Sequence, residues 1–209
     1  MQLQILQEAN NLVLNNSDIA AVFRAVTDGV KKIVEHDLAG IYVYHQGKNA
    51  FIPHTLSKQT KFSRELGKHP LPLGEGIISA AAMSGEMVWV NNAQLDPRSR
   101  YPKGVRPEKE HFIAIPLMDS KAVFGILVVA RNRDPQFLEE EINIVELFAK
   151  AVSVALENTR LHNELKILQK GNRQTDNKVS THQRNGKVAA GRMLVNFDGL
   201  KKDATQDRS

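Results

Sequence analysis

The sequence predicts an α+β domain, and three observations along the chain support this fold class. Apolar residues recur every three or four positions over the first 33 residues, which is typical of helices. From Asp37 to Arg131 the chain carries short apolar runs bounded by turn residues, which is typical of strands. After residue 137 the helical spacing returns and continues to residue 165. With 42% apolar residues in a chain of 209, a substantial core can be buried.

The N-terminal region predicts two helices separated by a capping signal. The first, within residues 1–16, carries an apolar line interrupted by Asn10, as on a coiled-coil seam, so we expect it to pair with a second copy. That line consists of Leu3, Leu6 and Val13. Residues 15–18 are N-cap types, and the helix that they begin runs from Ile19 to Ile33 with one apolar face.

The predicted sheet begins with a hairpin. Residues 39–44 and 50–55 have strand character, and the segment between them, residues 46–49, is a turn sequence. Pro53 has no N–H to donate to a neighbouring strand, so the second strand is expected at a sheet edge. Residues 58–72 then form a polar loop.

A small helix and a long connection follow. Residues 73–76 contain two glycines and turn the chain into a helix over residues 77–84, whose three consecutive alanines permit close packing. Residues 87–90 predict a short strand. Residues 91–110 form a second polar connection that holds Arg98, Arg100 and Arg106.

Two apolar strands and a long helix complete the domain. Residues 111–118 and 122–131 predict central strands joined by a tight hairpin, and Pro116 predicts a bulge or an end of pairing. The helix that follows begins with acidic residues, which the helix dipole favours, and carries a heptad seam that predicts a second dimer contact. The seam consists of Ile144, Phe148, Ala151, Ala155, Asn158, His162 and Leu165.

The formal net charge of +5 is confined to the end of the chain. Residues 169–209 hold nine Lys or Arg and four Asp or Glu, so the preceding 168 residues are formally neutral. This segment has one aromatic residue and few apolar ones, so we expect a basic disordered tail. A solvated linker explains its charge more simply than nucleic-acid binding does, and no nucleic-acid partner is predicted.

Five short motifs occur along residues 17–165, and together they resemble the GAF domain family of small-molecule sensor modules. They are residues 71–77 (LPLGEGI), residues 84–90 (SGEMVWV), Asp96-Pro97-Arg98, Ile115-Pro116-Leu117 and residues 157–161 (ENTRL). Asn92 departs from the family, where Asp is common. The motif of cyclic-nucleotide-binding members is matched only in part, by Asn132, Arg133, Phe137 and the acidic residues that follow. Neither cAMP nor cGMP is therefore predicted as the ligand.

The resemblance implies an antiparallel sheet of five to six strands in the order 2-1-5-4-3, flanked by helices. The sensor domain would span residues 17–157, with residues 1–16 as a dimer helix and residues 158–168 as a coiled-coil continuation. It also implies a pocket between the sheet, the helix at 77–84 and the connection at 91–110. The candidate pocket residues are Tyr42, Tyr44, Ile78, Trp89, Asp96, Arg98, Arg100, Tyr101 and Ile113.

Each pocket candidate also has a simpler interpretation. Guanidinium groups in the connection suit a carboxylate or phosphate ligand, but Arg98 could instead pair with Asp96 while the other arginines face water. The aromatic residues of the strands could form a pocket wall or fill the core. Glu110 and His111 lack metal-ligand spacing, and a solvated loop leading into a strand explains them better.

The composition excludes several classes of protein. Because the chain has no cysteine, disulfides, thiolate metal sites, cysteine nucleophiles and a covalently attached bilin are excluded, and with them the thiol chemistry of methionine sulfoxide reduction. No metal or resident cofactor is predicted, although haem held by a histidine stays open. The longest apolar stretch is too short to span a bilayer, and the N-terminus does not resemble a secretory signal, so we expect a cytoplasmic protein.

These features predict a non-enzymatic sensor domain. An unknown small molecule would bind noncovalently, and a homodimer of the terminal helices would pass its occupancy to a downstream signalling protein. The alternative is a ligand-free dimerisation or docking module that regulates a larger kinase, cyclase or transcription regulator. A ligand screen separates the two hypotheses, because only a binding domain is stabilised by a ligand.

Overall fold

The computed structural model describes residues 2–14, 19–57, 65, 68–101, 109–120, 122–161 and 165. The chain divides into two compact units, residues 1–159 and 160–209, and the sheet lies in the first. The predicted tail at 169–209, together with Arg106 and His162, lies outside the described residues. The side chains of Leu3 and Leu6 lie outside them as well.

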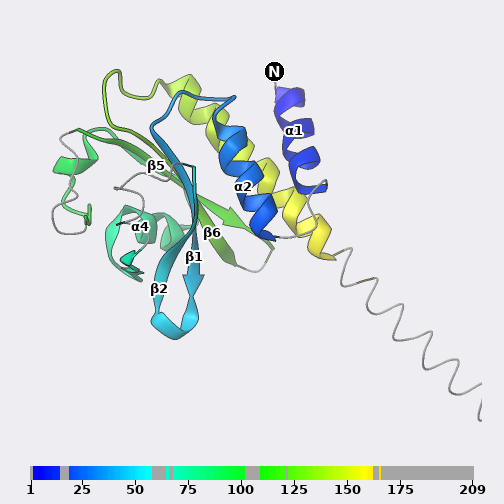
Figure 1. The fold of residues 1–209 in the computed structure, drawn as a ribbon, viewed down its shortest axis with the longest axis horizontal. Coiled ribbons are helices and arrows are strands. Elements are labelled where there is room, and N and C mark those ends of the chain that lie inside the picture. Colours follow the sequence, from blue (N-terminus) through cyan, green and yellow to red (C-terminus); the bar gives the residue numbers. More distant parts are fainter. Residues whose placement is uncertain are drawn as a thin grey trace, which may run out of the picture. The chain divides into compact units, whose positions relative to one another are not determined.

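An antiparallel sheet forms the centre of the first unit (Figure 1). Its strands are β1 (Leu38–His45), β2 (Ala50–Leu56), β3 (Leu71–Pro72), β4 (Val88–Val90), β5 (His111–Met118) and β6 (Val123–Arg131). Their order across the sheet is β3-β2-β1-β6-β5-β4. With the short β3 set aside, this is the order 2-1-5-4-3 that the family resemblance implies, so the predicted fold class is confirmed.

Pro53 and Pro116, the prolines of the longer strands, each lie outside one of the pairings that their strand makes. The β2–β3 pairing involves only Ala50 and Phe51 of β2, so β2 is covered at one end and Pro53 lies outside that pairing. The sequence prediction missed β3 because a two-residue strand has no periodicity. On β5, Pro116 pairs with Ile126 of β6, and the register shifts between Leu117 and Met118, so the irregularity that the proline predicted lies one residue after it.

Helices cover both faces of the sheet, as Figure 1 shows. On one face lie α1 (Gln2–Leu14), α2 (Ile19–Val30) and a helix over residues 139–161, here called the exit helix. On the opposite face lies α4 (Gly76–Ser84). The prediction extended α2 to Ile33, but residues 31–33 form tight turns in which each N–H donates to the carbonyl three residues earlier.

Strand alternation divides the core into two layers. On β1, Ala39 and Ile41 pack with the helices of the first face, while Tyr42 packs with α4 on the other. On β5, Ile113 faces the same helices as Ile41, whereas Ala114 faces α4. Successive residues of one strand therefore belong to opposite layers.

Much of the predicted dimer seam lies inside this core. Val13, Phe148, Ala151 and Ala155 are each no more than 8% exposed and pack in the core of their own chain. Ile144 is half-buried, and Asn158 and Leu165 are exposed. A helix that packs on a sheet also repeats apolar residues every three or four positions, so the heptad pattern could not separate core-facing residues from a free seam.

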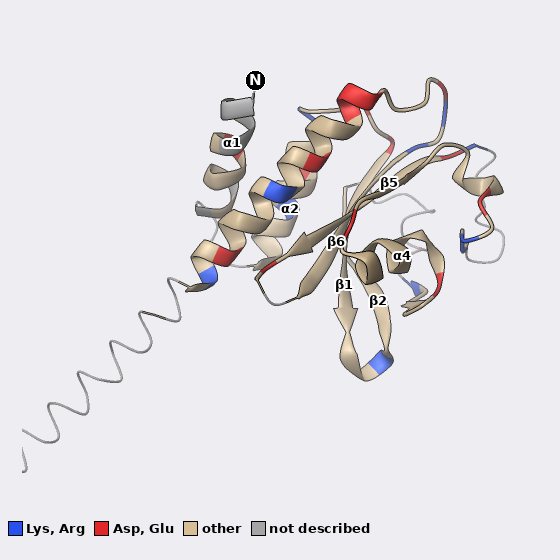
Figure 2. Ribbon diagram, turned by 180° about the vertical axis from the view of Figure 1, so that it is seen from behind, with Lys and Arg blue, Asp and Glu red and all other residues tan. Residues whose placement is uncertain are grey.

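Charge is distributed unevenly over the fold. Figure 2 shows acidic residues at the start of the exit helix, where the helix dipole favours them, and α4 carries no charged residue. Within the described part of the chain, no helix combines the length and apolarity that crossing a bilayer requires.

Candidate ligand-binding site

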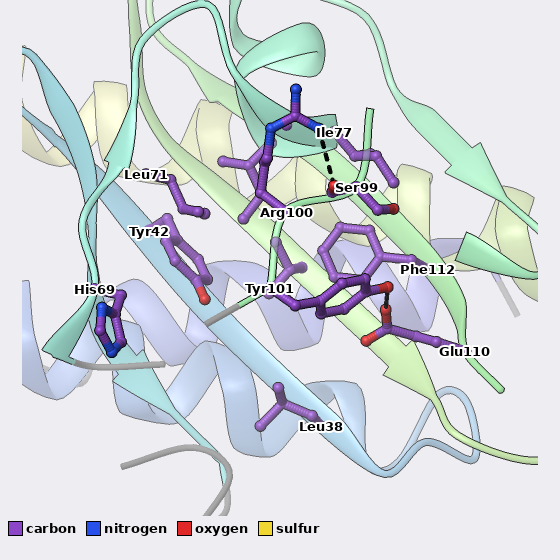
Figure 3. Close-up of a pocket in the computed structure, with 13 residues that line it drawn as sticks. Leu38, Tyr42, His69, Leu71, Ile77, Ser99, Arg100, Tyr101, Glu110 and Phe112 are labelled. Atoms are coloured by element: carbon purple, nitrogen blue, oxygen red, sulfur yellow. Dashed lines mark hydrogen bonds between the residues drawn. The ribbon is translucent and has the colours of Figure 1, made fainter. Parts of the chain in front are cut away.

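A cavity of about 60 Å³ lies between the α4 face of the sheet and the connection that follows β4 (Figure 3). This volume exceeds the roughly 10–15 Å³ that one water molecule requires. The apolar lining residues are Leu38, Leu71, Ile77, Ile78, Phe112 and Val128, and the others are Tyr42, His69, Gly76, Ser99, Arg100, Tyr101 and Glu110. The site is therefore an apolar chamber with a few polar groups, which is typical of small-molecule sites.

The glycine turn before α4 sets the chamber's upper wall. Gly74 and Gly76 have φ values of +91° and +84°, which side chains other than glycine rarely adopt. The N–H of Gly74 donates to Ser79 Oγ at 2.6 Å, which ties the turn to the buried first part of α4. The turn thereby directs Ile77 and Ile78 into the chamber.

Glu110 is the chamber's buried carboxyl group, at 5% exposure. Its N–H donates to Gln94 Oε1 at 2.8 Å, and its carbonyl accepts from the N–H of Ala93 at 2.6 Å. The Tyr101 hydroxyl donates to Glu110 Oε2, and no hydrogen bond within the described residues reaches Oε1. Burial raises the pKa of Glu110, and the bond from Tyr101 offsets part of this rise. The sequence interpretation of a solvated loop at this residue was wrong.

Tyr42 supplies a second phenol. It is 3% exposed, and burial together with the nearby charge of Glu110 raises its pKa well above the usual value. Its hydroxyl makes no hydrogen bond within the described part of the chain. In Figure 3 this hydroxyl points into the space between His69 and Tyr101.

Arg98 and Arg100, the arginines of the connection that the structure describes, have their guanidinium groups engaged outside the chamber. Arg98 donates to Asp96 Oδ1 at 3.0 Å and to Oδ2 at 2.8 Å, and its bonds hold the pKa of Asp96 below the usual value. Arg100 donates to the carbonyls of Pro97 and Ser99, both at 3.0 Å, and its Nε lies 3.5 Å from a carboxylate oxygen of Glu75. Figure 3 shows the Arg100 guanidinium pointing away from Tyr101 and Glu110.

The predicted pocket residues divide into two groups. Tyr42, Ile78, Arg100 and Tyr101 line the chamber. Asp96 and Arg98 pair in an adjacent turn, with side chains 11% and 48% exposed. Tyr44 donates to Asn49 Oδ1 at 2.7 Å near the hairpin end, and Trp89 is 49% exposed on the edge strand β4.

The prediction that Ile113 lines the pocket was wrong by one position along the strand. Ile113 lies in the core with the terminal helices, and its neighbour Phe112 lines the chamber instead. The choice between them depends on strand register, which the sequence did not define because both residues are apolar.

Glu110 was not among the predicted pocket residues. The signal that could have identified it is an acidic residue directly before a continuous apolar strand.

The described residues contain no group of three or more His, Cys, Asp or Glu side chains placed to bind a metal ion. What the chamber offers is thus a carboxyl group, two phenols and apolar walls.

Comparison with known proteins identifies the family of this fold. The sequence profile of the GAF domain matches residues 16–157, which is more than half of the chain. The chain belongs to the GAF domain family. No curated protein matches it.

Solved structures share the fold at low sequence identity. The GAF domain of a phosphoenolpyruvate-protein phosphotransferase from Coxiella burnetii is 20% identical with a TM-score of 0.64, covering 78% of this chain and 96% of that one. The free methionine-R-sulfoxide reductase of Neisseria meningitidis is 17% identical with a TM-score of 0.62, covering 77% and 91%. A GAF domain/HD domain protein from Geobacter sulfurreducens is 14% identical with a TM-score of 0.56, covering 75% and 96%.

Proposed function

We propose that this GAF domain is a non-enzymatic sensor module that binds a small molecule noncovalently in the chamber and transmits its occupancy to the exit helix. The observation that carries the proposal is the Glu110 carboxyl group, which lies buried in an apolar chamber and whose Oε1 is reached by no hydrogen bond from the described residues. A buried polar atom without a protein partner is costly unless a ligand or water satisfies it.

Strand β5 supports a route from the chamber to the exit helix. Glu110 directly precedes this strand, and Phe112 on it lines the chamber. At its other end the N–H of Met118 donates to Ser153 Oγ at 3.2 Å, and the N–H of Ser120 donates to Glu157 Oε1 at 2.9 Å. A ligand that shifts Glu110 would thereby act on an element bonded directly to the exit helix.

The absence of cysteine supports a non-enzymatic role. One structural neighbour is a free methionine-R-sulfoxide reductase. This chain has no cysteine, so no thiol is present to reduce a sulfoxide. We therefore propose that the chamber binds its ligand without transforming it.

We further propose that the module is a homodimer formed through the exit helix. Val154 and Leu161 are 58% and 44% exposed and lie seven positions apart, on a different side of the exit helix from the buried seam residues Phe148, Ala151 and Ala155. Sedimentation equilibrium should show a dimer at micromolar concentration and dissociation in Leu161→Glu. Leu138→Glu is the matched control, because Leu138 is 61% exposed at the other end of the helix. A wild-type monomer at high micromolar concentration would contradict the dimer.

A thermal-shift screen with small metabolites tests ligand binding. A ligand at 100 times its dissociation constant adds about 2.7 kcal/mol to the free energy of unfolding. The shift should weaken in Glu110→Gln and persist in Glu86→Gln, since Glu86 is exposed and remote from the chamber lining. The small volume of about 60 Å³ favours the second candidate, a ligand-free docking module, and a screen without any shift would support that candidate.

A further inference from the structure

We propose that the ligand of this chamber carries a compact hydrogen-bond-donating cation, a primary ammonium or an amidinium, which binds the Glu110 carboxylate. This inference rests on the sensor function proposed above and specifies the ligand's chemical class. It differs from the anionic ligand that the arginine-bearing connection suggested from sequence.

The buried carboxylate defines the ligand's charge. Glu110 Oε2 accepts the hydrogen bond from the Tyr101 hydroxyl, and no hydrogen bond from the described residues reaches Oε1. A carboxylate with a free oxygen in an apolar chamber requires a donor, and a cation supplies both the donor and the opposite charge. An anionic ligand would instead meet a second negative charge in a desolvated site.

Arg98 and Arg100 do not change the chamber's preference for a cationic ligand. Arg98 is paired with Asp96, and the guanidinium of Arg100 is directed at two backbone carbonyls and at Glu75. Both guanidinium groups would have to give up these contacts before they could bind an anion inside the chamber. Among the described residues, the polar groups that line it are the Glu110 carboxyl and the hydroxyls of Tyr42, Tyr101 and Ser99, with His69 and Arg100 at the rim.

Aromatic rings complete a cation-binding environment. Tyr42, Tyr101 and Phe112 all line the chamber, and the faces of aromatic rings attract cations, more strongly when water is excluded. The Tyr42 hydroxyl, which makes no protein hydrogen bond within the described residues, can accept from a second N–H of the ligand. An ammonium has three donors, so after binding the Glu110 carboxylate it still has N–H groups for other acceptors in the chamber.

The size of the chamber limits what is enclosed. A volume of about 60 Å³ accommodates a cationic head with a short apolar chain, so any larger part of the ligand must extend past His69 and Arg100 at the rim. Those two residues are exposed, so the rim could accept a polar group of either charge.

Matched probes test the proposal by two-dimensional amide NMR of the full chain. Propylammonium, propionate and 1-propanol have similar sizes and differ in charge, and each is titrated at constant ionic strength. We expect saturable shifts of the Glu110 and Phe112 amides with propylammonium, weaker ones with 1-propanol and none with propionate. Glu110→Gln, which retains an oxygen for Tyr101, should weaken propylammonium binding by about tenfold or more, because a charge-assisted bond is lost.

The outcomes separate this inference from the sensor function. Glu86→Gln is the matched control and should bind propylammonium as the wild type does. Saturable binding of propionate in preference to propylammonium would overturn the cationic assignment and leave the sensor proposal standing. If no probe moves the chamber amides saturably, the cationic assignment is overturned, and the thermal-shift screen decides the sensor proposal separately. A native amide spectrum of Glu110→Gln shows that lost binding does not come from lost folding.

Discussion

Arg131 joins the sheet to the start of the exit helix. Its replacement is expected to lower the free energy of unfolding more than replacement of the exposed Arg133 does. The side chain is 5% exposed, and Nη2 lies 2.8 Å from Glu141 Oε1. The guanidinium also donates to the carbonyl of Glu35 at 2.6 Å and to that of Pro135 at 3.1 Å. Its Cζ stands 4.3 Å from the centre of the Phe137 ring. One side chain therefore connects β6, the segment before β1 and the exit helix.

Replacement by methionine preserves the apolar stem of Arg131 and removes its charge. Removing one partner of a buried ion pair costs about 3–5 kcal/mol. Because the Glu141 side chain is 25% exposed, water compensates part of the loss, and we expect about 3 kcal/mol for Arg131→Met. Native domains are stable by only about 5–15 kcal/mol, so this is a large fraction of the total.

Urea denaturation followed by circular dichroism measures this loss. Arg133→Met is the matched control, because Arg133 is 55% exposed and bonds Asp37 at 3.2 Å on the surface, and it should cost under about 1 kcal/mol. In a double-mutant cycle, Arg131→Met and Glu141→Met should be coupled by about 1–2 kcal/mol. If Arg131→Met costs no more than Arg133→Met, Arg131 does not hold the helix to the sheet.

Three further predictions concern the exit helix, the glycine turn and the chamber. Ser153→Ala should lower the free energy of unfolding by about 1–2 kcal/mol and speed hydrogen exchange at the Met118 amide, which loses its acceptor; unchanged exchange would contradict this role. Gly74→Ala should cost about 1–2 kcal/mol through its positive φ alone, since an added Cβ meets nothing within 4 Å, and Gly74→Asn should cost less in the same urea titration; equal costs would contradict the backbone explanation. Because folding raises the pKa of Glu110, its contribution to stability is present at low pH and lost as pH rises through the folded pKa. Glu110→Gln should therefore gain stability relative to the wild type between pH 4 and pH 8, and a constant difference across that range would refute the burial argument.

The sheet could be predicted from sequence because its signals are local. Hairpin turns, the change of period at Asp37 and the position of Pro116 each depend on a few neighbouring residues. Strand order came from the family resemblance, and the structure confirms it. The short strand β3 was missed because two residues pair there only through the tertiary approach of the chain to Ala50 and Phe51.

The chamber was predicted less completely because its composition depends on register and on long-range folding. Ile113 and Phe112 are equally apolar, and only the pleat decides which one faces α4. Glu110 is buried because the connection folds back and places Gln94 and Tyr101 within hydrogen-bond distance of it. No local sequence pattern predicts this long-range contact. The heptad spacing of the exit helix could arise from packing on the sheet or from a dimer contact. The seam residue Phe148 is buried in the core, whereas Val154, which is outside that seam, is 58% exposed.

Hydrogen exchange of the exit helix, measured with the chamber empty and filled by propylammonium, tests the central claim most directly. If occupancy of the chamber is transmitted through β5, exchange at residues 141–157 should change when the Glu110 amide reports binding, and Ser153→Ala should reduce that change. If the Glu110 amide reports saturation while exchange along residues 141–157 stays the same, the chamber and the helix are not coupled, and the sensor mechanism is wrong.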